Sequence, residues 1–265
     1  MVDLSQFDWS IRNQVRPRMF RHDPALRCLR LAAYQGAQAV DVRRNHAKVF
    51  APTDFTEASL PAEEWTWLKR HWQPERLTAE RILCDTDCSS ETLWLLDDAV
   101  TARIARDDQA HLVEIAVDGP GSLACGWAIS GDQLSPWRVQ VRRTGMARAL
   151  RGLAIEQMAQ MAPVFHARCR AVIHSEVLEL AEQFALARRR TARSLLADRL
   201  SGYYNAFGET TITITHNVLA QRLNLRRATV TLALQELEGA KAIRSHRARI
   251  ELKDRERLIA LAHEY

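Results

Sequence analysis

The sequence predicts an α+β protein with a small β-domain, one long helix, and a C-terminal domain of short helices followed by a two-stranded wing. Three observations lead to this prediction. Short strand-like runs separated by turn residues fill residues 58 to about 150. After Pro163 a helical pattern continues over several turns without a further Gly or Pro. Near the C-terminus, two helical patterns flank a sharp turn and precede a pair of strands.

The chain of 265 residues is long enough for two domains with ordinary cores, and we divide it into four segments. Residues 1–53 predict a loosely ordered extension, either a dispensable leader or a basic arm, and Pro52 marks its end. The β-domain spans residues 54–151. A helical connector follows over 152–186, and the C-terminal domain takes up 187–265.

The β-domain is predicted from β-favouring residues and turn signals. Such residues run from Thr92 to Ile104 and from His111 to Val117, with Asp107-Asp108 as the hairpin turn between them. Gly119-Pro120-Gly121 predicts a second turn. Residues 137–141 alternate between apolar and polar, which indicates a late strand.

The long helix carries a narrow apolar stripe. A short helix over Glu156–Met161 precedes it, and Pro163 suits its first turn. Apolar residues then recur at spacings of three and four, which is typical of a two-stranded coiled coil and predicts a homodimer. The alternative is packing against the chain's own β-domain. The stripe consists of Phe165, Cys169, Val172, Ile173, Val177, Leu180 and Phe184.

The C-terminal domain begins its helical pair at Thr215, a good N-cap, and Asn224 suits the left-handed turn between the helices. The second helix is predicted from Arg226 to Glu238 and is expected to end at Gly239. The wing follows as a strand from Ala242-Ile243, a turn at Arg247-Ala248, and a return strand with inward-facing Ile250 and Leu252.

Four polar side chains are expected on the outer face of the second helix. Arginine pairs with guanine edges, and threonine contacts phosphates or thymine methyl groups, so a cluster at a helix start predicts DNA readout. The alternative is a helical hairpin with solvated arginines. The four residues are Arg226, Arg227, Thr229 and Thr231.

The C-terminal pattern resembles the winged helix-turn-helix of the Crp/Fnr superfamily of bacterial transcription regulators. LRRATVT (residues 225–231) carries the most specific part of this resemblance, which extends back to RSLLADRL (residues 193–200). Upstream, residues 58–87 resemble the opening helix and first strands of that family's cyclic-nucleotide-binding-like β-roll, and residues 93–150 resemble the rest of it. The resemblance covers residues 58–265.

The resemblance implies a homodimer on a double-stranded DNA operator, with RNA polymerase as a candidate further partner. Thr215 and His216 would open the positioning helix and contact phosphate, and Arg227 is the first choice for a guanine contact. Ala228 and Leu232 stand where the best-known members carry Glu and a second Arg, so the operator should differ from theirs. The wing residues that would hold phosphates are Arg244, Arg247 and Arg249.

The sensor pocket implied by the resemblance lacks the expected residues. Ser122 and Leu123 stand where cyclic-nucleotide binders need an acidic residue, and Arg138 is followed by Val139 instead of Ser or Thr. These four positions are the candidate effector pocket, and they argue against a cyclic nucleotide. A lone arginine without supporting donors is more often a surface residue.

Metal and cofactor sites are not predicted. The five cysteines are scattered, and the C-x3-C pair Cys84 and Cys88 lacks the further close thiolates that an iron–sulfur cluster needs. Incidental thiols explain them better. A haem ligand at His71 or His111 is a hypothesis of low prior, because a lone histidine is usually structural or exposed.

Charge and composition agree with a regulator. Residues 188–265 hold 15 Lys and Arg against 8 Asp and Glu, whereas residues 54–187 hold 13 against 20. Positive charge therefore gathers where phosphates would be neutralised. No signal-peptide pattern, membrane-length apolar run or catalytic motif is found, so we expect a cytoplasmic protein that is not an enzyme. The remaining alternative is a helical protein-interaction module with a ligand-sensing β-domain and no specific DNA readout.

Overall fold

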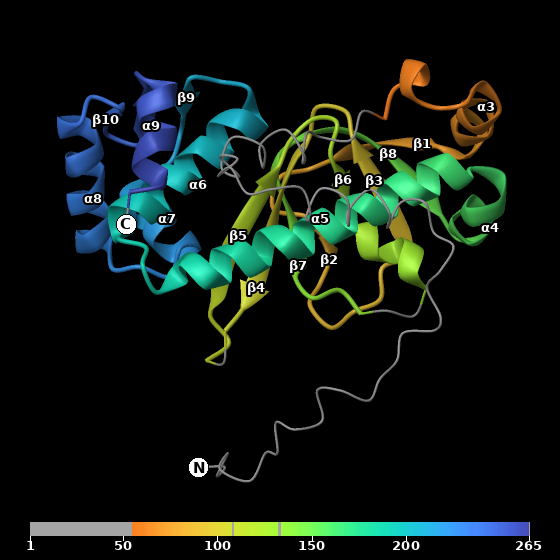
Figure 1. Ribbon diagram of the computed structural model, residues 1–265, viewed down its shortest axis with the longest axis horizontal. Coiled ribbons are helices and arrows are strands. Elements are labelled where there is room, and N and C mark those ends of the chain that lie inside the picture. Colours follow the sequence, from red (N-terminus) through yellow and green to blue (C-terminus); the bar gives the residue numbers. More distant parts are fainter. Residues whose placement is uncertain (1–54, 108, 132–133, 265) are drawn as a thin grey trace, which may run out of the picture. The chain divides into compact units, whose positions relative to one another are not determined.

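The computed structural model describes residues 55–107, 109–131 and 134–264, which lie within one compact unit spanning Phe50–Tyr265 (Figure 1). The predicted extension over residues 1–53 lies outside the described residues. The architecture confirms the predicted α+β fold class, with a β-rich domain followed by helices and a winged C-terminal domain.

The described residues before the long helices form mostly strands. In chain order the elements are η3 (Glu57–Ser59), α3 (Ala62–His71), β1 (Gln73–Leu77), β2 (Ile82–Cys84), β3 (Thr92–Leu96), β4 (Val100–Arg106), β5 (Leu112–Asp118), β6 (Leu123–Ala124), η4 (Gly126–Ser130), β7 (Arg138–Arg143) and β8 (Gly145–Arg151).

Helices dominate the rest of the described chain. The elements are α4 (Leu153–Met161), α5 (Pro163–Ala187), α6 (Ala192–Phe207), β9 (Thr211–Ile212), α7 (His216–Arg222), α8 (Arg227–Gly239), β10 (Ile243–His246), β11 (Arg249–Leu252) and α9 (Arg255–Ala262).

The strands before α4 form a β-roll of two four-stranded antiparallel sheets. Their orders are β1-β8-β3-β6 and β2-β7-β4-β5. Side chains from both sheets share one buried cluster, which includes Leu77 and Trp94 from the first sheet and Val139 and Val141 from the second. This shared apolar core holds the two sheets face to face.

The β-favouring run over residues 92–104 forms two strands that belong to different sheets. Asp97 and Asp98 break it, and the Asp98 carboxylate accepts a hydrogen bond from the backbone N–H of Met146. A Cβ on Gly145 would lie 2.4 Å from the backbone nitrogen of Ala99, so only glycine permits this close approach. Short polar side chains that bond to the backbone favour such turns, and here they end the strand.

The hairpin turn at Asp107 is confirmed. Its Oδ1 accepts hydrogen bonds from the backbone N–H groups of Gln109 at 2.9 Å and His111 at 2.7 Å. Asp108, the second residue of the predicted turn, lies outside the described residues. The turn joins β4 to β5, which pair along their whole length.

Helix α5 begins where the sequence predicts, with Pro163 in its first turn. The carboxylate of Glu64, a buried residue of α3, accepts hydrogen bonds from the N–H groups of Val164 at 3.0 Å and Phe165 at 2.9 Å. A helix N-terminus leaves such donors without intrahelical partners, and a carboxylate also complements the helix dipole. Glu64 therefore fixes the start of α5 on α3.

The first two residues of the predicted dimer stripe are not available to a partner. Phe165 and Cys169 are fully buried in a cluster with residues of α3 and the β-roll, and the Phe165 ring lies 5.2 Å from Phe55 and 5.8 Å from Trp72. The alternative of packing against the chain's own β-domain is therefore correct for this half of α5. Apolar spacing alone does not distinguish the two kinds of neighbour.

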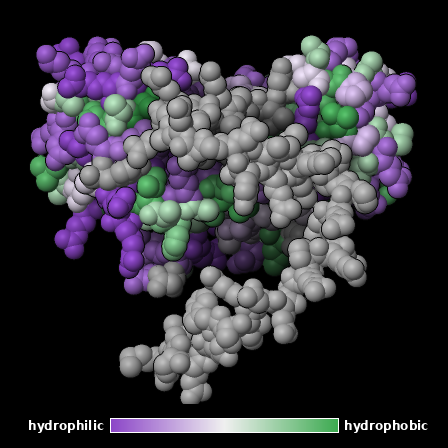
Figure 2. Space-filling view, viewed as in Figure 1, coloured by the Kyte–Doolittle hydropathy of each residue, from purple (hydrophilic) through white to green (hydrophobic). Residues whose placement is uncertain are grey.

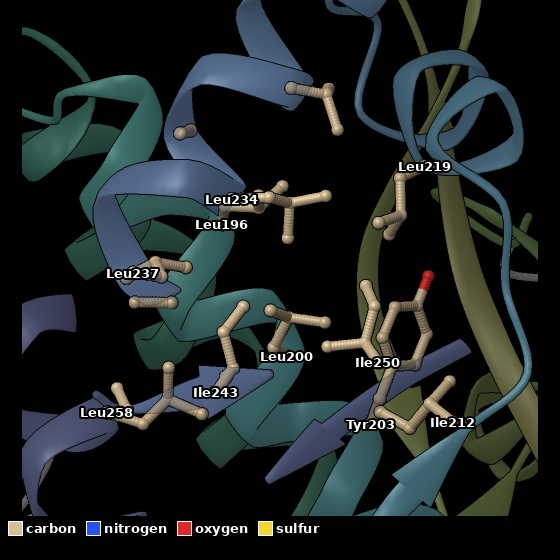
Figure 3. Close-up of a cluster of buried hydrophobic side chains, with 14 of the residues drawn as sticks. Leu196, Leu200, Tyr203, Ile212, Leu219, Leu234, Leu237, Ile243, Ile250 and Leu258 are labelled. Atoms are coloured by element: carbon tan, nitrogen blue, oxygen red, sulfur yellow. The ribbon is translucent and has the colours of Figure 1, made fainter. Parts of the chain in front are cut away.

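The C-terminal domain encloses a separate apolar core, with side chains from α6, α7, α8, α9 and the three-stranded sheet β10-β11-β9 (Figure 3). The Thr215 cap is confirmed, because its side chain accepts a hydrogen bond from the Val218 N–H at 3.2 Å. Asn224 has the expected left-handed backbone, with φ of 51°.

Helix α8 ends at Gly239 as predicted, but the left-handed residue that closes it is not this glycine. Gly239 is its last residue, and the left-handed position is Lys241, with φ of 60°. The N–H of Ala242 donates to the carbonyl of Leu237, and that of Lys241 donates to Glu238. This pair of bonds is the Schellman arrangement, which usually places glycine where Lys241 stands.

Replacing Glu64 with alanine should lower the free energy of unfolding by about 1–3 kcal/mol, because two buried N–H groups would lose their acceptor. Urea denaturation of the full chain measures this change. The matched control is Glu63→Ala, which removes an exposed carboxylate from the same helix turn and should shift stability by less than about 0.5 kcal/mol. Equal losses in the two variants would contradict the capping role.

Candidate nucleic-acid interface

The starts of α7 and α8 and the turn of the wing surround an open hollow of about 820 Å³. Five of its lining residues were predicted contacts or belong to the predicted wing turn, and three were not singled out from the sequence. The lining consists of Thr215, His216, Asn217, Arg227, Ser245, His246, Arg247 and Ala248. In the space-filling view, hydrophilic residues dominate the side of the molecule that carries α8 and β10 (Figure 2).

His216 ties the three parts of this hollow together. Its Nδ1 lies 3.1 Å from the Thr231 hydroxyl of α8, and its Nε2 lies 3.3 Å from the Ser245 hydroxyl of the wing. The Thr231 hydroxyl also donates to the carbonyl of Arg227 at 3.1 Å, so it accepts from His216. The imidazole therefore positions α8 against the wing. The family resemblance had instead predicted that His216 contacts a DNA phosphate.

The outer face of α8 differs from the predicted one. Successive side chains turn by about 100° around a helix, so the face opposite the buried residues is centred on Ala228, Leu232 and Gln235. Leu232 is 61% exposed. Thr229 and Thr231 are only half-exposed, on the two flanks of this face. The buried residues that define the opposite side are Val230, Ala233, Leu234 and Leu237.

Leu232 and Gln235 are thus candidate contacts that the sequence interpretation did not assign. The helical pattern of the buried residues contains the signal for both, because it defines the opposite face. Thr231 was assigned to that face, and its hydroxyl is instead engaged by His216 and Arg227. Partners on another element could not be read from the local sequence.

Five arginines at the start of α8 and on the wing are exposed, and two of them, Arg227 and Arg247, line the hollow. Within the described residues none of them forms an ion pair with a carboxylate, whereas the arginines of the β-roll sheets are repeatedly paired. Unpaired guanidinium groups can bind phosphate oxygens in pairs of hydrogen bonds. Arg226 and Arg227 also lie at the N-terminus of α8, where the helix dipole favours anions. The five are Arg226, Arg227, Arg244, Arg247 and Arg249.

A buried carboxylate connects the β-roll to the helix-turn-helix. Glu114 of β5 is 1% exposed and accepts hydrogen bonds from the Tyr203 hydroxyl of α6 and, at 2.9 Å, from Arg142 Nε of β7. Arg222 of α7 lies 3.8 Å from the same carboxylate and donates to the Tyr203 oxygen at 3.3 Å. Burial, and then the charge of Glu114, raise the pKa of Tyr203, so the phenol stays protonated and donates.

Two further contacts join the same parts of the chain. The Asn224 side chain donates to the Asp107 carboxylate at 3.3 Å, which links the helix-turn-helix turn to the β4–β5 hairpin. Arg143 donates to the carbonyl of Phe207 at 2.8 Å, at the end of α6. None of these partners was predicted, because each pair is distant in sequence. The β-roll therefore holds α6 and α7 directly.

Among the described residues, the four predicted effector-pocket residues lie in different surroundings. Leu123 and Val139 are buried in two different clusters, and Ser122 is half-buried in a turn. Arg138 is bound by both oxygens of Asp85, with Nε and Nη2 each at 2.9 Å. This pairing lowers the pKa of Asp85, so its negative charge persists and occupies the guanidinium.

Another arginine fills the space between the β-roll and α5. Arg103 of β4 is 8% exposed, binds Asp118 with Nε and Nη2 at 3.1 Å, and reaches Glu179 of α5 at 3.1 Å. The Glu176 carboxylate lies 3.9 Å from the Arg103 guanidinium. Burial raises the pKa of Glu176 to about 8, although the positive charge of Arg103 acts to lower it. Salt-bridged side chains thus occupy this contact between β-roll and helix, and the sequence interpretation missed Arg103.

The candidate metal ligands are engaged locally. His111 lies 3.0 Å from the Asp107 carboxylate, and His71 donates to the Trp67 carbonyl at 2.8 Å and stacks on its ring. Cys84 is buried, whereas Cys88 is exposed. Within residues 55–107, 109–131 and 134–264, no three or more His, Cys, Asp or Glu side chains gather in a way that could hold a metal ion. In the same ranges no helix is long and apolar enough to cross a membrane.

Comparison with known proteins identifies the domain family that the C-terminal domain matches. Residues 189–261 match the Crp-like helix-turn-helix domain family. No curated protein sequence matches the chain. Among solved structures, FixK2 from Bradyrhizobium japonicum is 15% identical, with a TM-score of 0.61, and the match covers 73% of this chain and 98% of that one.

Two other solved structures have the same fold. CLP, the c-di-GMP responsive global regulator of Xanthomonas campestris, is 11% identical, with a TM-score of 0.60 over 72% of this chain and 99% of that one. A CRP/FNR family transcriptional regulator from Thermus thermophilus, TTHA1359, is 18% identical, with a TM-score of 0.55 over 72% and 99%. At these identities the likeness shows the fold: β-roll, long helix and winged helix in one chain.

Replacing Glu114 with glutamine should lower the free energy of unfolding by about 3 kcal/mol, because it leaves buried Arg142 without its closest charge partner. Thermal or urea denaturation of the full chain tests this. Glu80→Gln is the control, since Glu80 also faces Arg142, at 3.6 Å, but is exposed to solvent. That variant should stay within about 0.5 kcal/mol of the parent. A Glu114→Gln protein as stable as the parent would show that the network does not stabilise the fold.

Proposed function

We propose that the chain is a transcription regulator of the Crp/Fnr superfamily and that it acts as a homodimer on a roughly palindromic DNA operator. One observation carries the proposal. Five exposed arginines at the start of α8 and on the wing have no carboxylate partner among the described residues, and two of them, Arg227 and Arg247, line the hollow between α7, α8 and the wing. A regulator needs such unpaired cations, because neutralising phosphates supplies most of the non-specific affinity for DNA.

Helix α8 is proposed to enter the major groove with its N-terminus and its exposed face. Arg227 lies in its first turn and lines the hollow, so it is our choice for a guanine contact. Leu232 offers an apolar side chain to a thymine methyl group, and Gln235 can pair with an adenine edge. This combination should select an operator different from those of members that carry Glu and a second Arg at the positions of Ala228 and Leu232.

The wing and the start of α7 are proposed to hold the DNA backbone. Arg244, Arg247 and Arg249 are exposed on the two strands and the turn of the wing, and Thr215 is exposed beside them. Phosphate contacts fix the register of a protein on the duplex without reading bases. His216 has a different role in this proposal, since its two ring nitrogens are occupied and keep α8 and the wing in register.

The second half of α5 is proposed to form the dimer seam with a second copy of the chain. Val177, Leu180 and Phe184 are 44%, 38% and 82% exposed and follow Ile173 at spacings of four, three and four residues. At about 100° per residue they lie within one narrow stripe. A phenylalanine so exposed costs free energy in water, and pairing two copies would bury it. The seam thus begins after Phe165 and Cys169, which are core residues.

The β-roll is proposed to respond to something other than a cyclic nucleotide. That ligand needs an acidic partner for the ribose and an arginine for the phosphate. Here Leu123 is buried where an acid was wanted, and Asp85 already holds Arg138. The residues present therefore do not fit the group. The Arg103 cluster under α5 supports the same proposal, because charged side chains of the protein itself occupy that contact.

Arg227→Ala should weaken binding to the selected operator by about 1–3 kcal/mol and relax the preference at one base pair of each half-site. Fluorescence anisotropy at one stated salt concentration measures this. Arg76→Ala is the matched control, because it removes the same charge from an exposed position on β1. If both variants lose affinity equally, for operator and scrambled duplex alike, Arg227 does not read a base.

Phe184→Asp should split the dimer, because a charge buried in the seam would have no partner. Sedimentation velocity reports the change, and circular dichroism checks that the monomer remains folded. The control is Leu178→Asp on the same helix, since Leu178 is 44% exposed but lies about 120° from Phe184 around the helix axis. That variant should remain dimeric. A Phe184→Asp protein that sediments as a dimer would place the interface elsewhere.

A further inference from the structure

Two cysteines far apart in sequence meet inside the β-roll. Cys84 is the last residue of β2 in one sheet, and Cys125 directly follows β6 in the other. They are 6% and 3% exposed and belong to the same buried cluster. The Cys125 thiol lies within hydrogen-bonding reach of the Cys84 sulfur. Neighbouring thiols on two different sheets are the arrangement from which a disulfide between the sheets can form.

The surroundings make the two thiols chemically different. Hydrogen bonds from Cys125, Ser135 and Ser90 lower the pKa of Cys84 to about 6, against the effect of burial. The hydrogen bond to Cys84, together with burial, raises the pKa of Cys125 well above its usual value. The lowered pKa makes Cys84 the more readily ionised of the two thiols, and Cys125 is the one that keeps its proton more firmly. A nucleophilic thiolate next to a second thiol is the arrangement that redox-active pairs use.

The backbone at Cys125 supports a specific placement of its sulfur. The φ of 58° and ψ of 39° at Cys125 are in the left-handed region, which residues other than glycine rarely adopt. The glycine of this segment, Gly126, stands one position later. Sparsely populated backbone conformations concentrate at functional sites. The residue in this conformation is a cysteine whose side chain is buried in the cluster that also contains Cys84.

We propose that Cys84 and Cys125 are a redox-active dithiol that a hydroperoxide converts into a disulfide joining the two sheets of the β-roll. The Cys84 thiolate attacks the peroxide, the O–O bond breaks, and an alcohol or water leaves, which gives a sulfenic acid. Cys125 then attacks that sulfur, the S–S bond forms, and water leaves. Two thiols lose two electrons and two protons, and the hydroperoxide is reduced to an alcohol and water.

The disulfide would lie beside the contact between the β-roll and α5. Gly126 begins η4 directly after Cys125, and a Cβ there would lie 3.2 Å from the Ile173 side chain of α5. Cys84 ends its strand immediately before the turn over residues 85–88, which includes the exposed Asp87 and Cys88, so a small peroxide has a short path to it. The chemistry does not depend on DNA binding, and a failed operator test would leave it standing.

Peptide mapping of the reduced full chain after one equivalent of hydrogen peroxide tests the proposal. Trypsin leaves Cys84 and Cys88 together in the peptide 82–103 and isolates Cys125 in the peptide 107–138. The Cys88→Ser variant makes the assignment unique and serves as the control, because its disulfide should form as in the parent. We expect those two peptides to be linked, with Cys28 and Cys169 still blocked by maleimide after unfolding.

The pH dependence of the reaction distinguishes the pair from ordinary thiols. The thiolate fraction of a group with a pKa near 6 rises about tenfold between pH 5 and pH 7 and is then nearly constant. The rate of disulfide formation should follow this curve, whereas an ordinary thiol would continue to gain about tenfold per unit up to pH 8. In Cys125→Ser, dimedone should trap the sulfenic acid at Cys84. A different disulfide, oxidation at Cys88 alone, or a rate that still climbs above pH 7 would overturn the proposal.

Discussion

The buried carboxylate of Glu114 is the interaction on which the arrangement of the domains depends. Glu114 is 1% exposed, and burying a charged group costs much free energy unless polar partners lie close to it. Here the partners come from the β-roll, from α6 and from α7. Any displacement of α7 from β5 would leave the charge without part of this support. The positioning helix of the DNA-binding domain is therefore fixed by a residue of the β-roll.

The same constraint extends to the candidate interface through short steps. Helix α7 carries His216, and His216 holds both α8 and the wing by its two ring nitrogens. The residues that line the hollow are therefore carried by α7, α8 and the wing, and His216 fixes these elements relative to one another. The Glu114 contacts therefore bear on the helix that carries His216, and His216 contacts both α8 and the wing.

Much of this organisation was predictable where the signal is local. Thr215, Asn224, Pro163 and the Asp107 turn act on neighbouring backbone groups, and all four behave as the sequence indicates. The failures involve partners that are distant in sequence. The burial of Phe165 and the roles of Glu114 and Thr231 depend on which element packs opposite, and apolar spacing or residue type cannot specify that. The residue that packs against the break at Asp97 and Asp98, Gly145, is likewise distant in sequence.

Selection of bound sequences from random duplex DNA, with the purified full chain at a stated salt concentration and no added ligand, tests the central claim most directly. A two-fold symmetric motif with half-sites about 34 Å apart, one helical turn of DNA, is the result expected for a homodimer with this winged helix. Binding that falls steeply with salt and enriches no sequence would mean that the arginines hold phosphates alone. That result would contradict operator recognition by α8.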